Sequence, residues 1–345
     1  MGRFATRLSN IAHKLALEPY TVALLGMVVL ASFLPASGDV AVALGDVTTF
    51  AIGLLFFLHG AKLSREAIVA GLLHWRLHLL VLASTFVMFP LMGIVLEPLA
   101  LPLLTPDLYL GILFLCVLPS TVQSSIAFTA MARGNVAAAV CSASASNFLG
   151  IFLTPLLVGA LIVGSSQGSA GDAGFGWSQV LSIVEQLLLP FVAGQLLRPW
   201  IGALVDRHKP VLRYVDQGSI LLVVYAAFSE SVTEGLWQHV SGATLAGLIG
   251  VCCLMLVIAL GLATWTSRRL GFSKEDEITI VFCGSKKSLA TGVPMAKVLF
   301  APSALGMIIL PVMLFHQIQL MVCAVLAQRW ARRVEAVASV PADVQ

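Results

Sequence analysis

The sequence predicts an all-α membrane protein whose ten transmembrane helices form two inverted five-helix repeats. Of its 345 residues, 59% are hydrophobic and only 11% are charged, and the mean hydropathy is +0.96. A soluble domain normally carries about a quarter charged residues. The apolar residues also fall into segments long enough to cross a bilayer, and the basic residues cluster between those segments. These observations place the chain in a membrane.

The number of spans follows from the apolar segments. A spanning helix needs roughly 20 mostly apolar residues. Segments of this kind cover residues 20–36, 47–62, 77–97, 107–132, 136–162, 177–197, 217–235, 243–265, 277–299 and 303–328. With the N-terminus in the cytoplasm, this count puts every one of the 20 Lys and Arg residues at a cytoplasmic end except Lys286, Lys287 and Lys297. The positive-inside rule therefore predicts that both termini are cytoplasmic.

The chain divides around one flexible linker. The sequence GSSQGSAGDAGFG at 164–176 separates a first five-helix repeat at 20–163 from a second at 177–328. An odd number of spans in each half gives the halves opposite orientations. Residues 1–19 resemble an amphipathic interfacial segment, and 329–345 form a cytoplasmic tail. A signal peptide is the alternative for the N-terminus, although no small-x-small cleavage site follows the first apolar stretch.

Composition and motifs exclude several classes of function. The six cysteines lie in apolar runs without a CxxC pair, so we expect neither disulfides nor a metal site, and no cofactor. The basic residues do not gather on one domain, which argues against nucleic-acid binding. No GxSxG or HExxH motif is present, and the protein is not expected to be an enzyme.

Two of the apolar segments are interrupted by polar residues and helix breakers. The fourth contains VLPSTVQSSIAFT, which includes Pro119, and the ninth contains FCGSKKSLATGVP, which ends at Pro294. Backbone opened at membrane depth is tolerated only where it is buried in protein or lines a cavity, so the pair predicts a binding site between the halves. Kinks without any transport role are the alternative. The candidate substrate- or ion-binding residues are Gln123, Ser124, Ser125, Thr129, Asn147, Ser285, Lys286, Lys287 and Ser288.

These motifs resemble those of a known transporter family. LPSTVQSSIAFTAMARGNVAAAV, LTPLL at 153–157, LPFVAGQLLRPW at 189–200 and FCGSKKSLATGVPMA are similar to the bile acid:sodium symporter superfamily, specifically its bacterial symporter-like branch. The resemblance implies ten helices, a panel domain, and a core domain in which two discontinuous helices cross. It also implies a multi-pass protein of the bacterial plasma membrane.

The sodium site of that family transfers only in part. The resemblance keeps Ser125 and Thr129 as ligands, but the remaining ligand positions hold Ile126, Ala139, Ala143, Phe282 and Lys286. Sodium requires several oxygen ligands, and these side chains cannot supply them. A shift of the alignment by one residue would bring in oxygens from Gln123, Ser124 or Asn147.

A lysine ammonium can take the place of sodium at the crossing, where it would offset the partial negative charge of freed carbonyls. Adjacent helical residues point about a hundred degrees apart, so one of Lys286 and Lys287 is expected to face the cavity, and the family alignment favours Lys286. Glu185 and His316 are candidates for a proton relay. Glu185 could instead be an interfacial carboxylate, and His316 an interhelical hydrogen-bonding residue.

The function expected from these features is secondary transport of a small organic anion by alternating access, with a proton or sodium as the coupling ion. The residues favour a mechanism that does not use sodium in the usual way. A sodium-coupled symporter of bile-acid-like anions is the first alternative. A regulatory membrane protein without flux is the second, because resemblance does not prove turnover.

Overall fold

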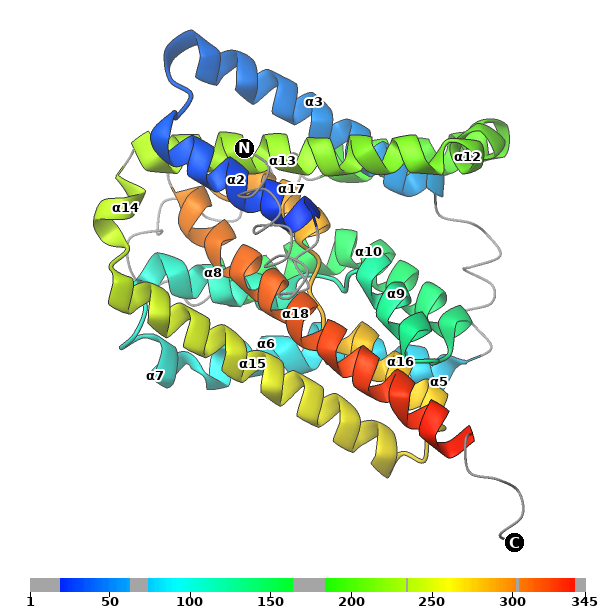
Figure 1. The fold of residues 1–345 in the computed structure, drawn as a ribbon. Coiled ribbons are helices and arrows are strands. Elements are labelled where there is room, and N and C mark those ends of the chain that lie inside the picture. Colours follow the sequence, from blue (N-terminus) through cyan, green and yellow to red (C-terminus); the bar gives the residue numbers. More distant parts are fainter. Residues whose placement is uncertain (1–18, 63–73, 164–183, 234, 302–303, 339–345) are drawn as a thin grey trace, which may run out of the picture.

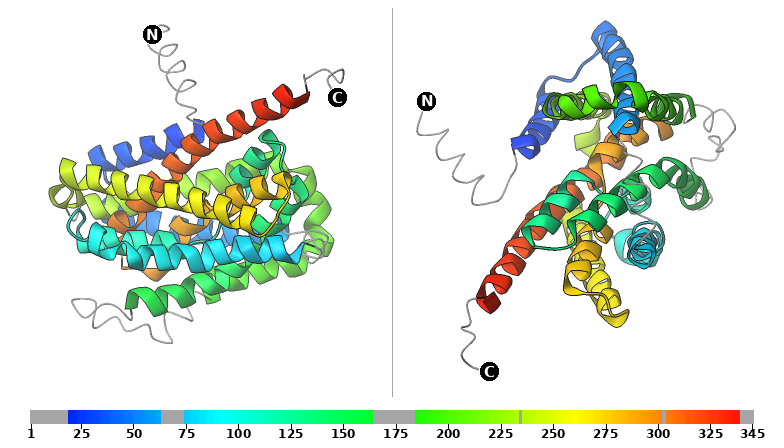
Figure 2. Two further views of the ribbon diagram at one scale, coloured as in Figure 1. Left: turned by 90° about the horizontal axis from the view of Figure 1, so that it is seen from below. Right: turned by 90° about the vertical axis from the view of Figure 1, so that its right-hand side faces the viewer.

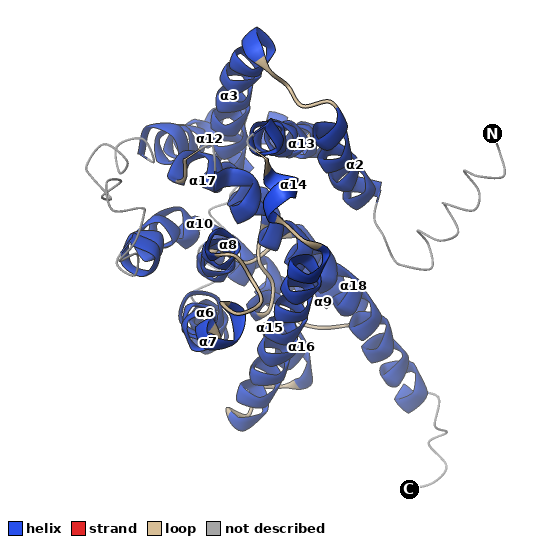
Figure 3. Ribbon diagram, turned by 90° about the vertical axis from the view of Figure 1, so that its left-hand side faces the viewer, coloured by secondary structure: helices blue, strands red, loops and turns tan. Residues whose placement is uncertain are grey.

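The computed structural model describes residues 19–62, 74–163, 184–233, 235–301 and 304–338, and every regular element within these ranges is a helix (Figure 3). The predicted linker at 164–176 and all but the last residue of the predicted interfacial segment at 1–19 lie outside the described residues.

Seven of the described helices are long and apolar enough to cross a membrane. They are α3 (Gly38–Lys62), α5 (Trp75–Ala83) continued by η1 (Ser84–Met88) and α6 (Phe89–Val95), α10 (Val136–Val158) continued by η2 (Gly159–Val163), η3 (Val184–Leu188) continued by α12 (Leu189–Arg207), α13 (Lys209–Thr233), α15 (Gly242–Arg269) and α18 (Leu305–Ala338). A multi-pass membrane protein follows, as the composition predicts.

The three remaining predicted segments have a different form. The first is the shorter helix α2 (Pro19–Phe33). The fourth divides into α8 (Pro106–Val117) and α9 (Gln123–Met131), and the ninth into α16 (Lys274–Gly284) and α17 (Leu289–Leu299). Two short helices, α7 (Glu97–Ala100) and α14 (Leu236–His239), lie in connections.

Several helices extend beyond the predicted spans. Helix α3 begins nine residues before position 47, at Gly38, and α13 begins at Lys209 instead of 217. Hydropathy detects only the part of a helix that matches the hydrocarbon core, whereas backbone hydrogen bonding continues into the interface.

The helices form two layers. Helices α2, α3, α12 and α13 lie together along one side of the molecule, and the other helices form the thicker second layer (Figures 1 and 2). Within the first layer α3 and α12 pack with almost no space between their backbones. A Cβ added at Gly60 would lie 2.0 Å from the Phe191 carbonyl oxygen, and one at Gly194 would lie 2.0 Å from the Phe57 carbonyl oxygen. Small residues allow membrane helices to approach this closely.

The second layer surrounds α8 and α18. These two helices pack against one another, and large aromatic side chains fill the space beside them; the rings of Phe89 and Phe315 meet edge to face with centroids 6.1 Å apart. Side chains such as Val257 and Leu156 are well exposed on the outer surface. An apolar exterior of this kind is expected where lipid replaces water.

Candidate functional site at the crossing of two interrupted helices

The first interruption lies between α8 and α9. Helix α8 ends at Val117, and Leu118 is extended (φ −70°, ψ 151°) because it precedes Pro119. The chain remains non-helical until α9 starts at Gln123. Within this turn the Thr121 hydroxyl lies 2.8 Å from the Ser124 hydroxyl and 2.9 Å from the Ser125 hydroxyl.

The second interruption lies between α16 and α17. Helix α16 ends at Gly284, and residues 285–288 are non-helical. The Ser288 hydroxyl caps the next helix by accepting from the Thr291 N–H at 3.2 Å. Both breaks therefore occur at the residues that the sequence predicts.

The two interruptions touch, although about 165 residues separate them. The Ser288 N–H donates to the Pro119 carbonyl at 2.9 Å. In the other direction, the Ser120 hydroxyl donates to the Cys283 carbonyl at 2.5 Å and the Ser125 hydroxyl to the Phe282 carbonyl at 3.0 Å. Hydroxyls at the first break therefore donate to the last carbonyls of α16, the helix before the second break. Carbonyls at the end of a helix otherwise lack backbone donors.

Helix α10 holds the crossing from one side. The Asn147 side-chain amide donates to the Ser120 carbonyl at 2.6 Å and accepts from the Thr291 hydroxyl at 2.8 Å, so it joins both breaks. Gly150 allows the Pro119 ring to lie against the helix, since a Cβ there would be 2.7 Å from the Pro119 Cβ.

Lys287 places its charge at the end of α8. Its side chain is 0% exposed, and Nζ lies 2.8 Å from each of three carbonyl oxygens, those of Thr85, Cys116 and Leu118. Three acceptors require three N–H donors, which an ammonium has and a neutral amine does not. The positive group also lies 4.2 Å from the centre of the Phe89 ring and at the negative end of the α8 dipole.

Local backbone geometry explains why these three carbonyls are available. In the π-helical turn η1, the Phe89 N–H donates to Ser84 instead of Thr85, and residue 90 is a proline without an N–H. The Ser120 N–H, which would reach Cys116 in a continuous helix, donates to the Ser146 hydroxyl at 3.0 Å. One π-helical turn and one proline break therefore leave acceptors that the lysine satisfies.

Helix α18 fixes the backbone of Lys287. The Lys287 N–H donates to the Gln319 Oε1 at 2.9 Å, and the Gln319 Nε2 donates to the Lys287 carbonyl at 2.9 Å. His316 Nδ1 lies 3.0 Å from the Gln319 Nε2 and 3.5 Å from the Lys287 carbonyl oxygen, so the imidazole belongs to the same network in either tautomer.

Lys286 turns to the opposite side of the crossing. It is also 0% exposed; Nζ donates to the Ser124 carbonyl at 2.9 Å and lies 4.0 Å from the centre of the Phe128 ring and 5.3 Å from that of Phe282. The two side chains point in different directions, Lys286 toward α9 and Lys287 toward α8 and η1. Both are enclosed by protein.

The other predicted site residues have varied positions. Gln123 is exposed, and Ser124 and Asn147 are half-buried, so they form the accessible edge of the crossing. Thr129 is buried, and its hydroxyl has no hydrogen-bond partner within the described ranges. Glu185 is exposed in η3, and the three acceptors of Lys287 come from other residues.

Several residues that make bonds in this site were not among the sequence candidates, including Thr85, Ser120, Ser146, Thr291 and Gln319. Thr85 acts through its carbonyl, which no side-chain pattern reveals. Gln319 carried a signal, since an amide in the middle of an apolar span usually bonds to another helix.

Aromatic rings and ammonium groups lie side by side at the crossing. Within the part of the chain that the structure describes, no group of three or more His, Cys, Asp or Glu could hold a metal ion. Phe282 stands at a position where the resemblance implies a sodium ligand. Its ring faces Lys286 Nζ, and its ring centroid lies 5.3 Å from that of Trp330. The Ser125 hydroxyl donates to a carbonyl. The ammonium groups of Lys286 and Lys287 lie against the backbone carbonyl oxygens of the crossing.

Long apolar helices around two interrupted helices that meet inside the protein are typical of membrane transporters. The chain belongs to the SBF-like CPA transporter family (DUF4137), whose sequence model matches residues 18–332. This membership confirms the resemblance to the bile acid:sodium symporters.

Relatives from bacteria and animals align along nearly the whole chain. The sequence is 67% identical over 316 residues to the uncharacterized protein PA2026 of Pseudomonas aeruginosa, covering 92% of this chain and 93% of that protein. It is 57% identical over 319 residues to the Escherichia coli protein named Putative symporter YfeH, covering 92% and 94%. It is 30% identical over 326 residues to sodium/bile acid cotransporter 7-B of Xenopus laevis, covering 92% of both chains.

Proposed function

We propose that this protein is a secondary active transporter of a small organic anion, in which lysine ammonium groups take the place of a coupling sodium ion at the helix crossing. One observation carries the proposal: Lys287 Nζ lies 2.8 Å from three carbonyl oxygens, two of them at the end of the interrupted helix α8. A covalently attached cation does there what a bound monovalent ion would do.

The charge at the crossing favours an anionic substrate. Lys287 is bonded to neutral carbonyls, so much of its field extends beyond its immediate partners. At an effective dielectric constant near 20, a positive charge stabilises an anion about 8 Å away by roughly 2 kcal/mol. The amide of Gln123 and the hydroxyl of Ser124 lie at the accessible edge, where they would bind the substrate's oxygens, and Asn147 would position them through its bond to the Ser120 carbonyl.

The proposed architecture is ten spans in two inverted repeats, 20–163 and 177–328, with both termini in the cytoplasm. The distribution of Lys and Arg supports this topology, and the equivalent positions of the two breaks support the repeat. Helices α2, α3, α12 and α13 would be the panel, and the second layer would be the core that moves against it. Reporter fusions at residues 170 and 345 test the topology, which requires an external signal at the first site and a cytoplasmic signal at the second.

Coupling to sodium is the second candidate function. The name of the Xenopus relative favours it, as do the hydroxyls of Ser125 and Thr129, which the resemblance places among the sodium ligands. Protons are the alternative coupling ion, with His316 and Glu185 as the candidate relay. A regulatory protein without flux is the remaining possibility.

Uptake into proteoliposomes separates these functions. The assay uses a radiolabelled bile acid and a short carboxylate as probes, with a pH gradient or a sodium gradient imposed separately. We expect uptake that follows the pH gradient and ignores sodium. Uptake that requires sodium would favour the symporter, and no flux of either probe under any gradient would favour the regulator.

A variant links the transport to the crossing. Lys286→Gln keeps a hydrogen-bond donor and removes the charge, so we expect weaker anion-induced thermal stabilisation and a changed pH dependence. Arg213→Gln is the control, because Arg213 is exposed on α13. Unchanged anion affinity of Lys286→Gln at every pH would remove Lys286 from the binding site.

A further inference from the structure

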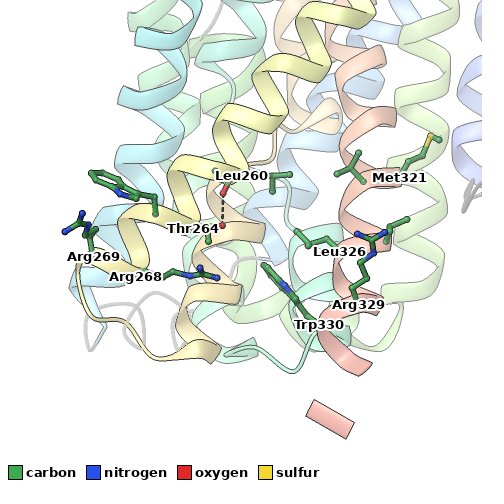
Figure 4. Close-up of a pocket in the computed structure, with 12 residues that line it drawn as sticks. Leu260, Thr264, Arg268, Arg269, Met321, Leu326, Arg329 and Trp330 are labelled. Atoms are coloured by element: carbon green, nitrogen blue, oxygen red, sulfur yellow. Dashed lines mark hydrogen bonds between the residues drawn. The ribbon is translucent and has the colours of Figure 1, made fainter. Parts of the chain in front are cut away.

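A large groove lies between α15 and α18, next to the carboxyl end of α15, and its lining residues come from these two helices and not from the two breaks. Its volume is about 1010 Å³. Figure 4 shows α15 with Leu260 and Arg268 on one side and α18 with Met321 and Arg329 on the other. Trp330 closes the end where the arginines lie.

The two ends of the groove differ in chemistry. Leu260, Met321 and Val325 make one end apolar, and Arg268 and Arg329 make the other end basic. From Met321 to Arg329 the helix rises about 12 Å, which carries the groove from hydrocarbon depth to the end of the span. Trp265 and Trp330 lie at the basic end, where aromatic residues of membrane proteins usually meet the interface.

The basic end carries more positive charge than its carboxylate partner neutralises. Arg268 donates twice to Glu277, at 3.1 Å each, and Lys274 bonds to the same carboxylate, which is 6% exposed. Two cations therefore share one anion. Arg329 and Arg269 are exposed and line the groove, so with Arg268 and Lys274 this end has four cations against the three carboxylates in the first turn of α16, those of Glu275, Asp276 and Glu277.

Part of the apolar lining of the groove is exposed at the protein surface, where lipid would meet it. Val322 is 41% exposed and Val325 is 48% exposed on the lining of α18. A water-soluble ligand would gain nothing from this apolar end, whereas an acyl chain would. Basic pockets between membrane helices bind anionic lipid head groups.

We propose that this groove binds an anionic phospholipid, with an acyl chain along Leu260 and Val325 and the phosphate on Arg329 and Arg268. The lipid would brace the ends of α15 and α18. Trp330 connects the groove to the helix crossing. Its ring centroid lies 5.3 Å from that of Phe282, and the Phe282 ring centroid lies 5.3 Å from Lys286 Nζ.

The test measures lipid binding to the full-length protein in neutral detergent. Dioleoyl phosphatidylglycerol or dioleoyl phosphatidylcholine is titrated into the micelles, and the unfolding midpoint and lipid-bound masses are recorded. We expect phosphatidylglycerol to raise the midpoint and phosphatidylcholine to do so much less. Arg329→Gln should weaken the apparent affinity for phosphatidylglycerol about fivefold, the effect of one basic residue at a membrane surface.

Two further variants keep the result interpretable. Val325→Trp fills the apolar end and should also weaken phosphatidylglycerol binding, whereas Arg213→Gln, an exposed arginine on α13, should leave it unchanged. The proposal is overturned if phosphatidylcholine stabilises the parent equally, or if Arg213→Gln weakens binding as much as Arg329→Gln. Stabilisation of the same size by free glycerol phosphate would also overturn it, since the head group alone would then suffice.

Discussion

Replacing Lys287 by methionine tests whether a tethered cation holds the crossing together. Methionine keeps much of the side-chain volume and removes the ammonium, so the carbonyls of Thr85, Cys116 and Leu118 lose their donor. A buried acceptor without a partner costs roughly 1–3 kcal/mol. Three of them would cost roughly 3–9 kcal/mol. Methionine avoids the desolvation penalty of a buried ammonium, which is several kcal/mol, so we take about 3 kcal/mol as the net loss.

Lys286→Met provides the matched comparison. Lys286 is the adjacent residue and equally buried, and its Nζ donates to the Ser124 carbonyl at 2.9 Å. Loss of that bond should cost about 1 kcal/mol. A larger loss for Lys287→Met than for Lys286→Met would assign the difference to the carbonyls at the end of α8 and in the turn η1.

Heat-induced unfolding in detergent, followed by tryptophan fluorescence, measures both losses. At about 2 °C for each kcal/mol, Lys287→Met should lower the midpoint by about 6 °C and Lys286→Met by about 2 °C. A Lys287→Met protein as stable as the parent would refute the reasoning, and so would an equal fall in the two variants. The same proteins in proteoliposomes show whether the loss of stability extends to transport.

Three other substitutions test the packing around the site. Gly60→Ala should abolish folding, because its Cβ would overlap the Phe191 carbonyl of α12. Gly45→Ala is the control, because its Cβ meets nothing within 4 Å. Size-exclusion chromatography in detergent should show a folded peak for Gly45→Ala and none for Gly60→Ala. Gly150→Ala should destabilise the protein by about 1–3 kcal/mol by displacing Pro119, and a midpoint equal to that of the parent would contradict the close contact. Thr291→Val should cost about 1 kcal/mol by removing the bond to Asn147; a larger fall in uptake than in stability would mean that this bond positions the crossing for transport.

Hydropathy identified the membrane-spanning helices because the bilayer imposes a length and a composition on each of them. The two interruptions were equally visible, since Pro119 cannot continue a helix and the polar residues around it would not face lipid. Helix ends were predicted less well: α3 and α13 begin eight or nine residues before the apolar segments that revealed them. Interfacial residues continue the helical hydrogen bonds without contributing to hydropathy.

The partners of the lysines could not be predicted from the chain. The carbonyl of Thr85 is available only because η1 is π-helical and Pro90 lacks an N–H, and that of Cys116 only because the Ser120 N–H turns to Ser146. Backbone acceptors carry no side-chain signature. That one of the two lysines, Lys286, faces the cavity stays a prediction, since both side chains are enclosed at the crossing.

By itself the sequence determined that the chain lies in a membrane, where its helices break, and which residues at the breaks are charged. Each of these is a local property, set by the cost of placing polar groups and unpaired backbone in hydrocarbon. The tertiary structure decided that the breaks lie against one another and that each supplies donors for the other's carbonyls. That outcome depends on the packing of segments more than 150 residues apart, which no local pattern records.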